Sequence, residues 1–132
     1  MKIFPTSQKL FISFLLVLFV FISGCQKPFL EKVNVKQAKS IIAENKTNQK
    51  FAIIDVRTPQ EFESFHLKDA KNIDFLAEDF EREISLLDKS FTYLIYCRSG
   101  GRSGAATKKM RELGFTRIYD VDGGVIEWQK DK

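Results

Sequence analysis

TYLIYCRSGGRSG, residues 92–104, joins the pattern of a strand to the pattern of a helix start. The first five residues, TYLIY, are aromatic and β-branched and carry no charge, which is typical of a strand buried on both faces of a parallel sheet. Cys97 follows directly, and a glycine-rich turn separates it from a run of good helix formers. A buried strand that passes through a glycine turn into a helix is the building unit of α/β folds. The stretch therefore predicts an α/β domain.

The alternation of strand and helix patterns continues on both sides of this stretch. The apolar run FAIIDV, residues 51–56, has the same buried-strand pattern, and Thr58-Pro59-Gln60-Glu61 after it has the residues of a capped helix start. Further strands are expected at 72–74 and 116–121, with helices at 34–45, 59–64, 78–87, 103–113 and 125–129. Alternating strands and helices imply right-handed crossovers. The predicted fold is a mainly parallel central sheet with helices on both faces.

Cys97 occupies the place where parallel α/β sheets bind ligands, between the carboxyl end of a strand and a helix. Gly100 and Gly101 allow the backbone to form a cradle of N–H groups, and Arg98 and Arg102 add positive charge. These features and the helix dipole stabilise a thiolate, so the pKa of Cys97 should be depressed. A cysteine that ends a buried strand is often only a packed side chain. Two glycines and two arginines in the next five residues are hard to explain by packing and favour a nucleophile.

The segment CRSGGRSG, residues 97–104, resembles the active-site loop of rhodanese-like domains. IDVRTPQEF, residues 54–62, resembles the Asp-Val-Arg segment of that family. The family's carboxyl-terminal pattern is matched by Gly114-Phe115 to Tyr119, by Gly123-Gly124 and by Trp128. The three motifs occur in the family's order and span about residues 33–129. The resemblance implies a rhodanese-like fold for essentially the whole domain.

The resemblance also implies a single-domain sulfurtransferase of the thiosulfate sulfurtransferase type, with neither metal nor organic cofactor. Cys97 would take the outer sulfur of thiosulfate or a similar small anionic donor as a persulfide and pass it to cyanide, sulfite or a thiol. The groups expected to hold the persulfide and the leaving anion belong to the five residues Arg98, Ser99, Gly100, Gly101 and Arg102. No second cysteine lies in the domain to resolve the persulfide, so the acceptor must come from outside.

Three nearby side chains are expected to support the site rather than react. Asp55 and Arg57 lie at a strand end, where an acid and a base commonly form an ion pair or a cap. His66 is the only histidine and falls where the family often has one. Phe65 replaces the family's usual glycine before it and Lys68-Asp69 its usual Pro-Gly after it, so this loop departs from the pattern. A hydrogen-bonding role is expected for His66.

Three other functions are alternatives to the simple enzyme. Phosphatases with a related cysteine loop place an arginine six positions after the cysteine, where this chain has Ser103, so Cys97 to Arg102 is one residue too short for that loop. A non-catalytic binding module usually lacks the cysteine. A persulfide relay, fed by a protein donor instead of thiosulfate, fits the sequence as well as the simple enzyme does.

The first 24 residues have the layout of a signal peptide. Lys2 and Lys9 flank a polar start, and the apolar run from Leu10 to Ile22 is shorter than the about 20 residues that a membrane-spanning helix needs. Ile22-Ser23-Gly24-Cys25 resembles the lipobox of bacterial lipoproteins, which implies cleavage before Cys25 and a lipid on its sulfur. The alternative is an uncleaved anchor with a free thiol at Cys25. The resemblance places the protein on the periplasmic side of a bacterial membrane, and inner and outer membrane are left open.

Three parts are therefore expected: a signal peptide over 1–24, a lipidated Cys25 with a tether over 25–32, and one domain over 33–132. A chain of 132 residues has room for one ordinary domain. The net charge of +4 falls to +2 once Lys2 and Lys9 are removed, because 19 basic and 17 acidic side chains remain. That excess is too small to indicate nucleic-acid binding. A protein partner and the oligomeric state cannot be predicted from these residues.

Overall fold

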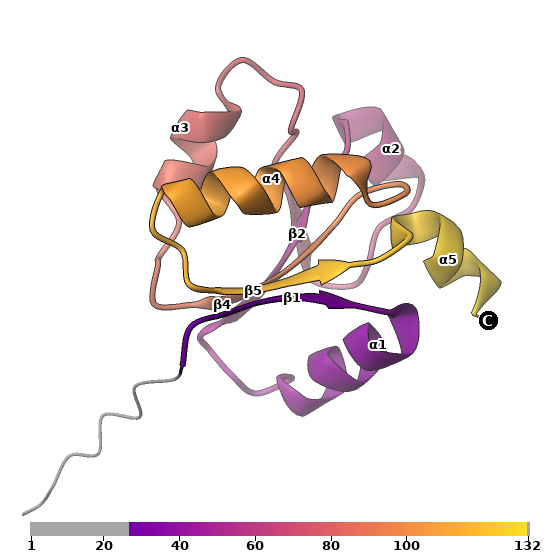
Figure 1. The fold of residues 1–132 in the computed structure, drawn as a ribbon. Coiled ribbons are helices and arrows are strands. Elements are labelled where there is room, and N and C mark those ends of the chain that lie inside the picture. Colours follow the sequence, from indigo (N-terminus) through magenta and orange to yellow (C-terminus); the bar gives the residue numbers. More distant parts are fainter. Residues whose placement is uncertain (1–26, 132) are drawn as a thin grey trace, which may run out of the picture.

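The computed structural model describes residues 27–131. The expected signal peptide and Cys25 lie outside the described residues. Among residues 27–131, none of the helices is both long and apolar enough to cross a membrane. The strands and helices shown in Figure 1 are, in chain order, β1 (Phe29–Val33), α1 (Val35–Glu44), β2 (Phe51–Asp55), α2 (Pro59–Ser64), β3 (Ala70–Asn72), α3 (Phe80–Ser85), β4 (Thr92–Tyr96), α4 (Gly101–Glu112), β5 (Arg117–Val121) and α5 (Gly124–Lys130).

The five strands form one sheet in the order β1-β5-β4-β2-β3, and every neighbouring pair is parallel. The predicted parallel α/β fold is confirmed. β4 is the central strand, and all five of its residues are buried, as expected for a charge-free strand covered on both faces. Because all strands run the same way, their carboxyl ends share one edge of the sheet. The residues that follow β2 and β4 therefore meet at that edge.

The sheet separates two hydrophobic cores. Figure 1 shows α3 and α4 on one side of the sheet and α1 on the other. The core under α3 and α4 contains Phe80, Ile84, Ala106 and Met110 from these helices, packed against residues of β2, β4 and β5. The core under α1 contains Val35 and Ala38, joined by Val125 of α5 and the half-buried Trp128. Layers on both faces hold the sheet edge that carries Cys97 in a fixed position.

Two helices start where their capping residues predict. Asn34 accepts a hydrogen bond from the Gln37 N–H, and the Gln37 side chain accepts one in return from the Asn34 N–H. Thr58 and Glu61 make the same reciprocal pair at the start of α2, where Pro59 is the first helical residue. Such capping boxes satisfy the free N–H groups at a helix start. Local sequence therefore determines where these helices begin.

The structure corrects several predicted boundaries, among them that of α3, which covers Phe80–Ser85 instead of 78–87. Residues 29–32 of the expected tether belong to β1, which pairs along its length with β5 at the edge of the sheet. The residues from Leu30 to Lys32 are exposed, so β1 lacks the apolar signal of a buried strand. β3 lies two residues before the predicted strand at 72–74. α4 begins at Gly101, two residues before the predicted start at 103, because Gly101, which resembles part of a turn, is its first residue and Gly100 precedes it as the N-cap.

Candidate functional site

Cys97 lies directly after β4, at the carboxyl edge of the sheet, in a loop that we call the Cys97 loop (residues 97–102). Cys97 is only 1% exposed, and its side chain is a free thiol. The Gly100 N–H donates a hydrogen bond to the Cys97 Sγ over 3.0 Å. Gly100 has a φ of +99°, a conformation that side-chain-bearing residues rarely adopt. A glycine at this position therefore lets the chain turn back and direct a backbone donor at the sulfur.

The surroundings of Cys97 favour its ionised form. Burial by itself raises the pKa of a thiol, since it penalises the charge. Hydrogen bonds from the backbone and the hydroxyl of Ser103 and from the N–H groups of Gly100 and Ser99 outweigh burial and lower the pKa of Cys97 below its ordinary value. This is the direction expected from the sequence. Ser103 was not among the site residues that the sequence indicated; it lies in the first turn of α4, and its hydroxyl also donates to the Gly100 carbonyl over 3.3 Å.

The two arginines of the Cys97 loop have different surroundings. Arg98 is exposed, and among residues 27–131 no acidic side chain forms an ion pair with it. Arg102 donates two hydrogen bonds to Glu61 of α2, over 2.7 and 2.8 Å. The charge of Arg102 is thus balanced by Glu61. That both arginines attract an anionic donor stays a prediction. The partner is 41 positions away, and no local pattern indicates it.

The pair between Glu61 and Arg102 gives the protein a pH-dependent stability. The Arg102 guanidinium lowers the pKa of Glu61 to about 2, from 4.5. Because the folded pKa lies below the unfolded one, the contribution is complete above about pH 4.5 and is lost as the pH falls toward 2. Glu61→Gln keeps the capping residue type and removes the charge. We expect it to lower the free energy of unfolding at pH 7 by about 1–2 kcal/mol, as for a charged hydrogen bond.

The measurement is urea unfolding of wild type and Glu61→Gln between pH 7 and pH 2. The difference between the two curves should shrink as the pH falls below 4.5. Glu63→Gln on the same helix is the control, because Glu63 is exposed and should give a small, flat difference. A Glu61→Gln difference that stays constant over the whole range would contradict the ion pair.

Asp55 and Arg57 form the buried ion pair that the sequence suggested. The Arg57 Nη2 lies 2.6 Å from the Asp55 Oδ2, and the side chains are 4% and 0% exposed. The Arg57 guanidinium also donates to the Phe65 carbonyl, and Asn72 donates to the carbonyls of both Asp55 and Arg57. The pair joins the end of β2 to the segment after α2 and to the end of β3. The hydrogen bonds of this ion pair therefore join backbone segments around the site, as the supporting role predicted for Asp55 and Arg57 requires.

His66 is exposed, and its Nδ1 lies 2.9 Å from the Phe62 carbonyl of α2. Its ring stacks on the Phe62 ring with 4.0 Å between centroids. Both contacts are local, as for a residue that closes the end of a helix. In residues 27–131 no group of three or more His, Cys, Asp or Glu side chains is placed to hold a metal ion.

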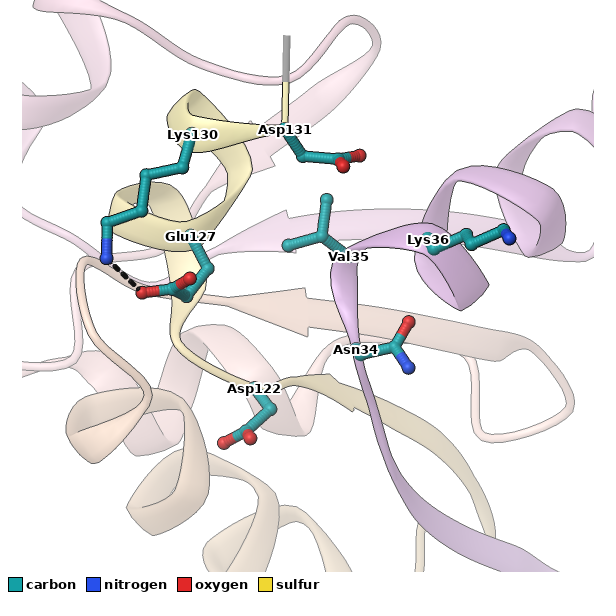
Figure 2. A pocket seen from close by; sticks show the side chains of 7 residues that line it. All are labelled: Asn34, Val35, Lys36, Asp122, Glu127, Lys130 and Asp131. Carbon is teal, nitrogen blue, oxygen red and sulfur yellow. Dashed lines mark hydrogen bonds and ion pairs between the residues drawn. The ribbon is translucent and has the colours of Figure 1, made fainter.

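A hollow of about 520 Å³ lies between the start of α1 and α5 (Figure 2). Its charged lining residues are Lys36, Lys130, Asp122, Glu127 and Asp131. Lys130 is paired with Glu127 over 2.6 Å, as the dashed line in Figure 2 marks. Three acidic against two basic side chains disfavour an anion there, and none of the lining residues belongs to the Cys97 loop. The N–H groups of the Cys97 loop suit an anion better than this hollow does.

A parallel α/β sheet, a buried low-pKa thiol after its central strand and a cradle of backbone N–H groups together define a class of domain that can carry a thiolate nucleophile. A family model described as "Rhodanese-like domain" matches residues 34–131. The chain belongs to the rhodanese-like domain family.

Curated relatives include enzymes named for sulfur transfer. Thiosulfate sulfurtransferase GlpE of Pseudomonas syringae is 38% identical over 78 residues, which are 58% of this chain and 71% of that protein. Chloroplastic thiosulfate sulfurtransferase 16 of Arabidopsis thaliana is 34% identical over 88 residues, 59% of this chain and 73% of the relative. The uncharacterized protein YqhL of Bacillus subtilis is 39% identical over 80 residues, and the match spans 61% of this chain and 62% of YqhL. The relatives that are named sulfurtransferases therefore share only a modest sequence identity with this chain.

The solved structures support the same fold. The crystal structure of a rhodanese-related protein from Thermoplasma volcanium superposes with a TM-score of 0.63 at 25% identity, covering 77% of this chain and 93% of that one. The solution structure of the rhodanese-like domain of Alr3790 from Anabaena has a TM-score of 0.66 at 23% identity, covering 78% and 76%. The latter identity supports the fold alone.

Proposed function

We propose that this protein is a sulfurtransferase that moves a sulfane sulfur from thiosulfate, or a similar small donor, through a persulfide on Cys97. The observation that carries the proposal is the hydrogen bonding of the Cys97 sulfur by the Gly100 N–H and the neighbouring donors of the cradle. A thiolate is the nucleophile in exchange at sulfur, so a lowered pKa gives Cys97 a larger reactive fraction than an ordinary thiol has at the same pH. The thiosulfate sulfurtransferases among the relatives support the reaction class.

The proposed reaction has two displacements at sulfur. In the first, the Cys97 thiolate attacks the outer sulfur of thiosulfate, the S–S bond of thiosulfate breaks, and sulfite leaves with the electron pair. In the second, cyanide, sulfite or a thiolate attacks the outer sulfur of the persulfide, and the Cys97 thiolate is restored. The N–H groups of the Cys97 loop would stabilise the negative charge of the thiolate and of the persulfide. Arg98 would attract the anionic donor.

The burial of Cys97 bears on the size of the donor. With 1% of the residue exposed, the sulfur is shielded from large partners. A persulfide extends one sulfur farther from the backbone, so the acceptor need not reach as deeply as the donor. A small anionic donor therefore fits this site better than a folded protein does.

The test is persulfide formation on the full chain in detergent. Thiosulfate is added in excess and removed, and intact-mass measurement should find one added sulfur that cyanide discharges as thiocyanate. Peptide mass spectrometry should place the sulfur on Cys97. If neither thiosulfate nor a polysulfide leaves an adduct, the simple enzyme is ruled out, and a protein-fed relay or a binding module takes its place.

We further propose that residues 1–24 are a signal peptide and that Cys25 carries the lipid at the cell envelope. The lipobox-like segment supports this placement, and β1 adds a geometric consequence. Only residues 26–28 separate Cys25 from β1, so the two are at most about 14 Å apart along the chain. The amino ends of the parallel strands would then face the membrane. The Cys97 loop, at the carboxyl edge, would face away from it.

Labelled palmitate tests the anchor. Bacteria expressing the full chain should incorporate the label, and the protein should sediment with membranes. Cys25→Ser should lose the label, because a serine hydroxyl cannot take the thioether-linked lipid. Cys97→Ser is the matched control and should keep it. Equal labelling of wild type and Cys25→Ser would show that the lipid, if any, is elsewhere.

A further inference from the structure

The amino end of α5 rests on the backbone of the Cys97 loop. The Val125 N–H donates to the Cys97 carbonyl over 2.9 Å, and the Ile126 N–H donates to the Arg98 carbonyl over 3.0 Å. These two donors precede the first hydrogen bond of the helix itself, which runs from the Glu127 N–H to the Gly123 carbonyl. The first turn of α5 therefore satisfies its free N–H groups with carbonyls of the loop.

These contacts determine which way a peptide unit of the loop faces. In a planar trans peptide, the C=O and the following N–H point in opposite directions. The Arg98 carbonyl points to the Ile126 N–H of α5, so the Ser99 N–H of the same peptide unit points the other way. The next N–H along the chain, that of Gly100, donates to the Cys97 sulfur over 3.0 Å, and the Ser99 N–H adds a smaller effect in the direction that lowers the pKa of Cys97. A rotation of this unit would bring a carbonyl oxygen toward the sulfur, where it would disfavour negative charge.

Gly124 makes this close approach possible. A Cβ on Gly124 would lie 2.3 Å from the Cys97 carbonyl oxygen and 2.8 Å from both the carbonyl carbon and the oxygen of Arg98. All three contacts are to backbone atoms, which cannot rotate away as the end of a side chain can. Gly124 is also buried and has a φ of +55°. Any side chain at this position must separate α5 from the Cys97 loop.

We propose that Gly124 is a positioning residue for sulfur transfer: it lets α5 dock on the Cys97 loop and hold the Arg98–Ser99 peptide unit, and with it the adjoining Gly100 N–H that donates to the sulfur. The inference rests on the proposed function for its link to sulfur transfer, while its link to the Cys97 thiolate can be measured without any sulfur donor. α5 then belongs to the chemistry of the site as well as to the core beneath it.

The experiment compares Gly124→Ala with wild type in the full chain. Iodoacetamide alkylation of Cys97 is followed from pH 5 to pH 10 by peptide mass spectrometry, which separates Cys97 from Cys25. We expect the midpoint of the profile to rise by about one pH unit, since a tenfold loss of thiolate corresponds to one unit. Persulfide formation from thiosulfate at pH 7 should fall by the same factor as the thiolate fraction that the two profiles give at that pH.

Gly114→Ala is the matched control, because Gly114 also has a positive φ, +91°, but lies at the other end of α4 with only Lys89 nearby. It should lower the melting temperature as a strained alanine does, and leave the alkylation midpoint unchanged. If Gly124→Ala also leaves the midpoint unchanged, Gly124 is only a structural glycine and the proposal fails.

Ile126→Pro covers the case in which Gly124→Ala does not fold, as judged by circular dichroism. Proline is tolerated in the first turn of a helix, removes the N–H that holds the Arg98 carbonyl, and puts its ring Cδ where that N–H was, so the Arg98 carbonyl must move. It should raise the midpoint, whereas Ile126→Ala, which keeps the N–H, should not. Equal midpoints for these two variants would overturn the proposal. If these variants shift the midpoint while the wild-type protein forms no persulfide, the proposed function is refuted and the positioning role stands.

Discussion

Cys97→Ser is expected to abolish sulfur transfer from thiosulfate to cyanide, with a loss in turnover of about a thousandfold or more. A serine hydroxyl remains protonated under conditions in which the Cys97 thiol ionises, and an oxygen in its place cannot form the persulfide. The side chain at position 97 is buried, and the Gly100 N–H can donate to a serine oxygen as it does to the cysteine sulfur, so the fold should be preserved. Turnover is measured as thiocyanate formed per unit time by full chain in detergent.

Cys25→Ser is the matched control for that experiment, because it makes the same chemical change outside residues 27–131. It should turn over thiosulfate at the wild-type rate in detergent. Cys97→Ser must also melt within a few degrees of wild type for the comparison to hold. If Cys97→Ser retains more than about a tenth of the wild-type turnover, the proposed persulfide route is wrong.

Asp55→Asn is expected to lower the free energy of unfolding by about 3–5 kcal/mol, the loss typical of breaking a buried ion pair by removing one partner. The substitution changes little in shape, but it leaves the Arg57 charge uncompensated in a position that is 3% exposed. Urea unfolding at pH 7 measures the loss. The folded protein should keep the wild-type alkylation midpoint of Cys97, because Asp55 supports the scaffold and is not among the groups that shift the pKa of Cys97.

Asp79→Asn is the control, since Asp79 pairs with Arg82 on the exposed surface of α3. Surface pairs contribute less than about 1 kcal/mol, so this variant should be nearly as stable as wild type. Equal losses in Asp55→Asn and Asp79→Asn would show that burial of the first pair carries no special weight. A large change in the Cys97 midpoint would instead make Asp55 part of the reacting site.

Features that depend on neighbouring residues were predictable. The capping residues Asn34 and Thr58 mark helix starts, and the apolar run of β4 identifies the central strand. The Cys97 loop is also continuous in the chain, so its glycines and its thiol could be identified together. The structure confirms the fold from these signals, and it places the Gly100 N–H against the sulfur as a turn at this position requires.

Features that join distant segments were not predictable. The residues next to Arg102 do not indicate which acid it pairs with, because its partner Glu61 is brought to it only by the fold. β1 was mistaken for a tether because an exposed edge strand owes its conformation to the hydrogen bonds of β5 rather than to its own side chains. Gly123-Gly124 resembled a turn, and its approach to the Cys97 loop was not visible.

The amino-acid sequence by itself determined the alternation of strands and helices, the place of the thiol after a buried strand, and the glycines that let the chain turn around it. These follow from conformational preferences and hydrogen bonds within a few residues. The tertiary structure alone decided which charges stay free, which strand forms the edge, and that α5 holds the Cys97 loop. Those outcomes depend on the strand order β1-β5-β4-β2-β3, which brings together residues that only packing and long-range hydrogen bonds can connect.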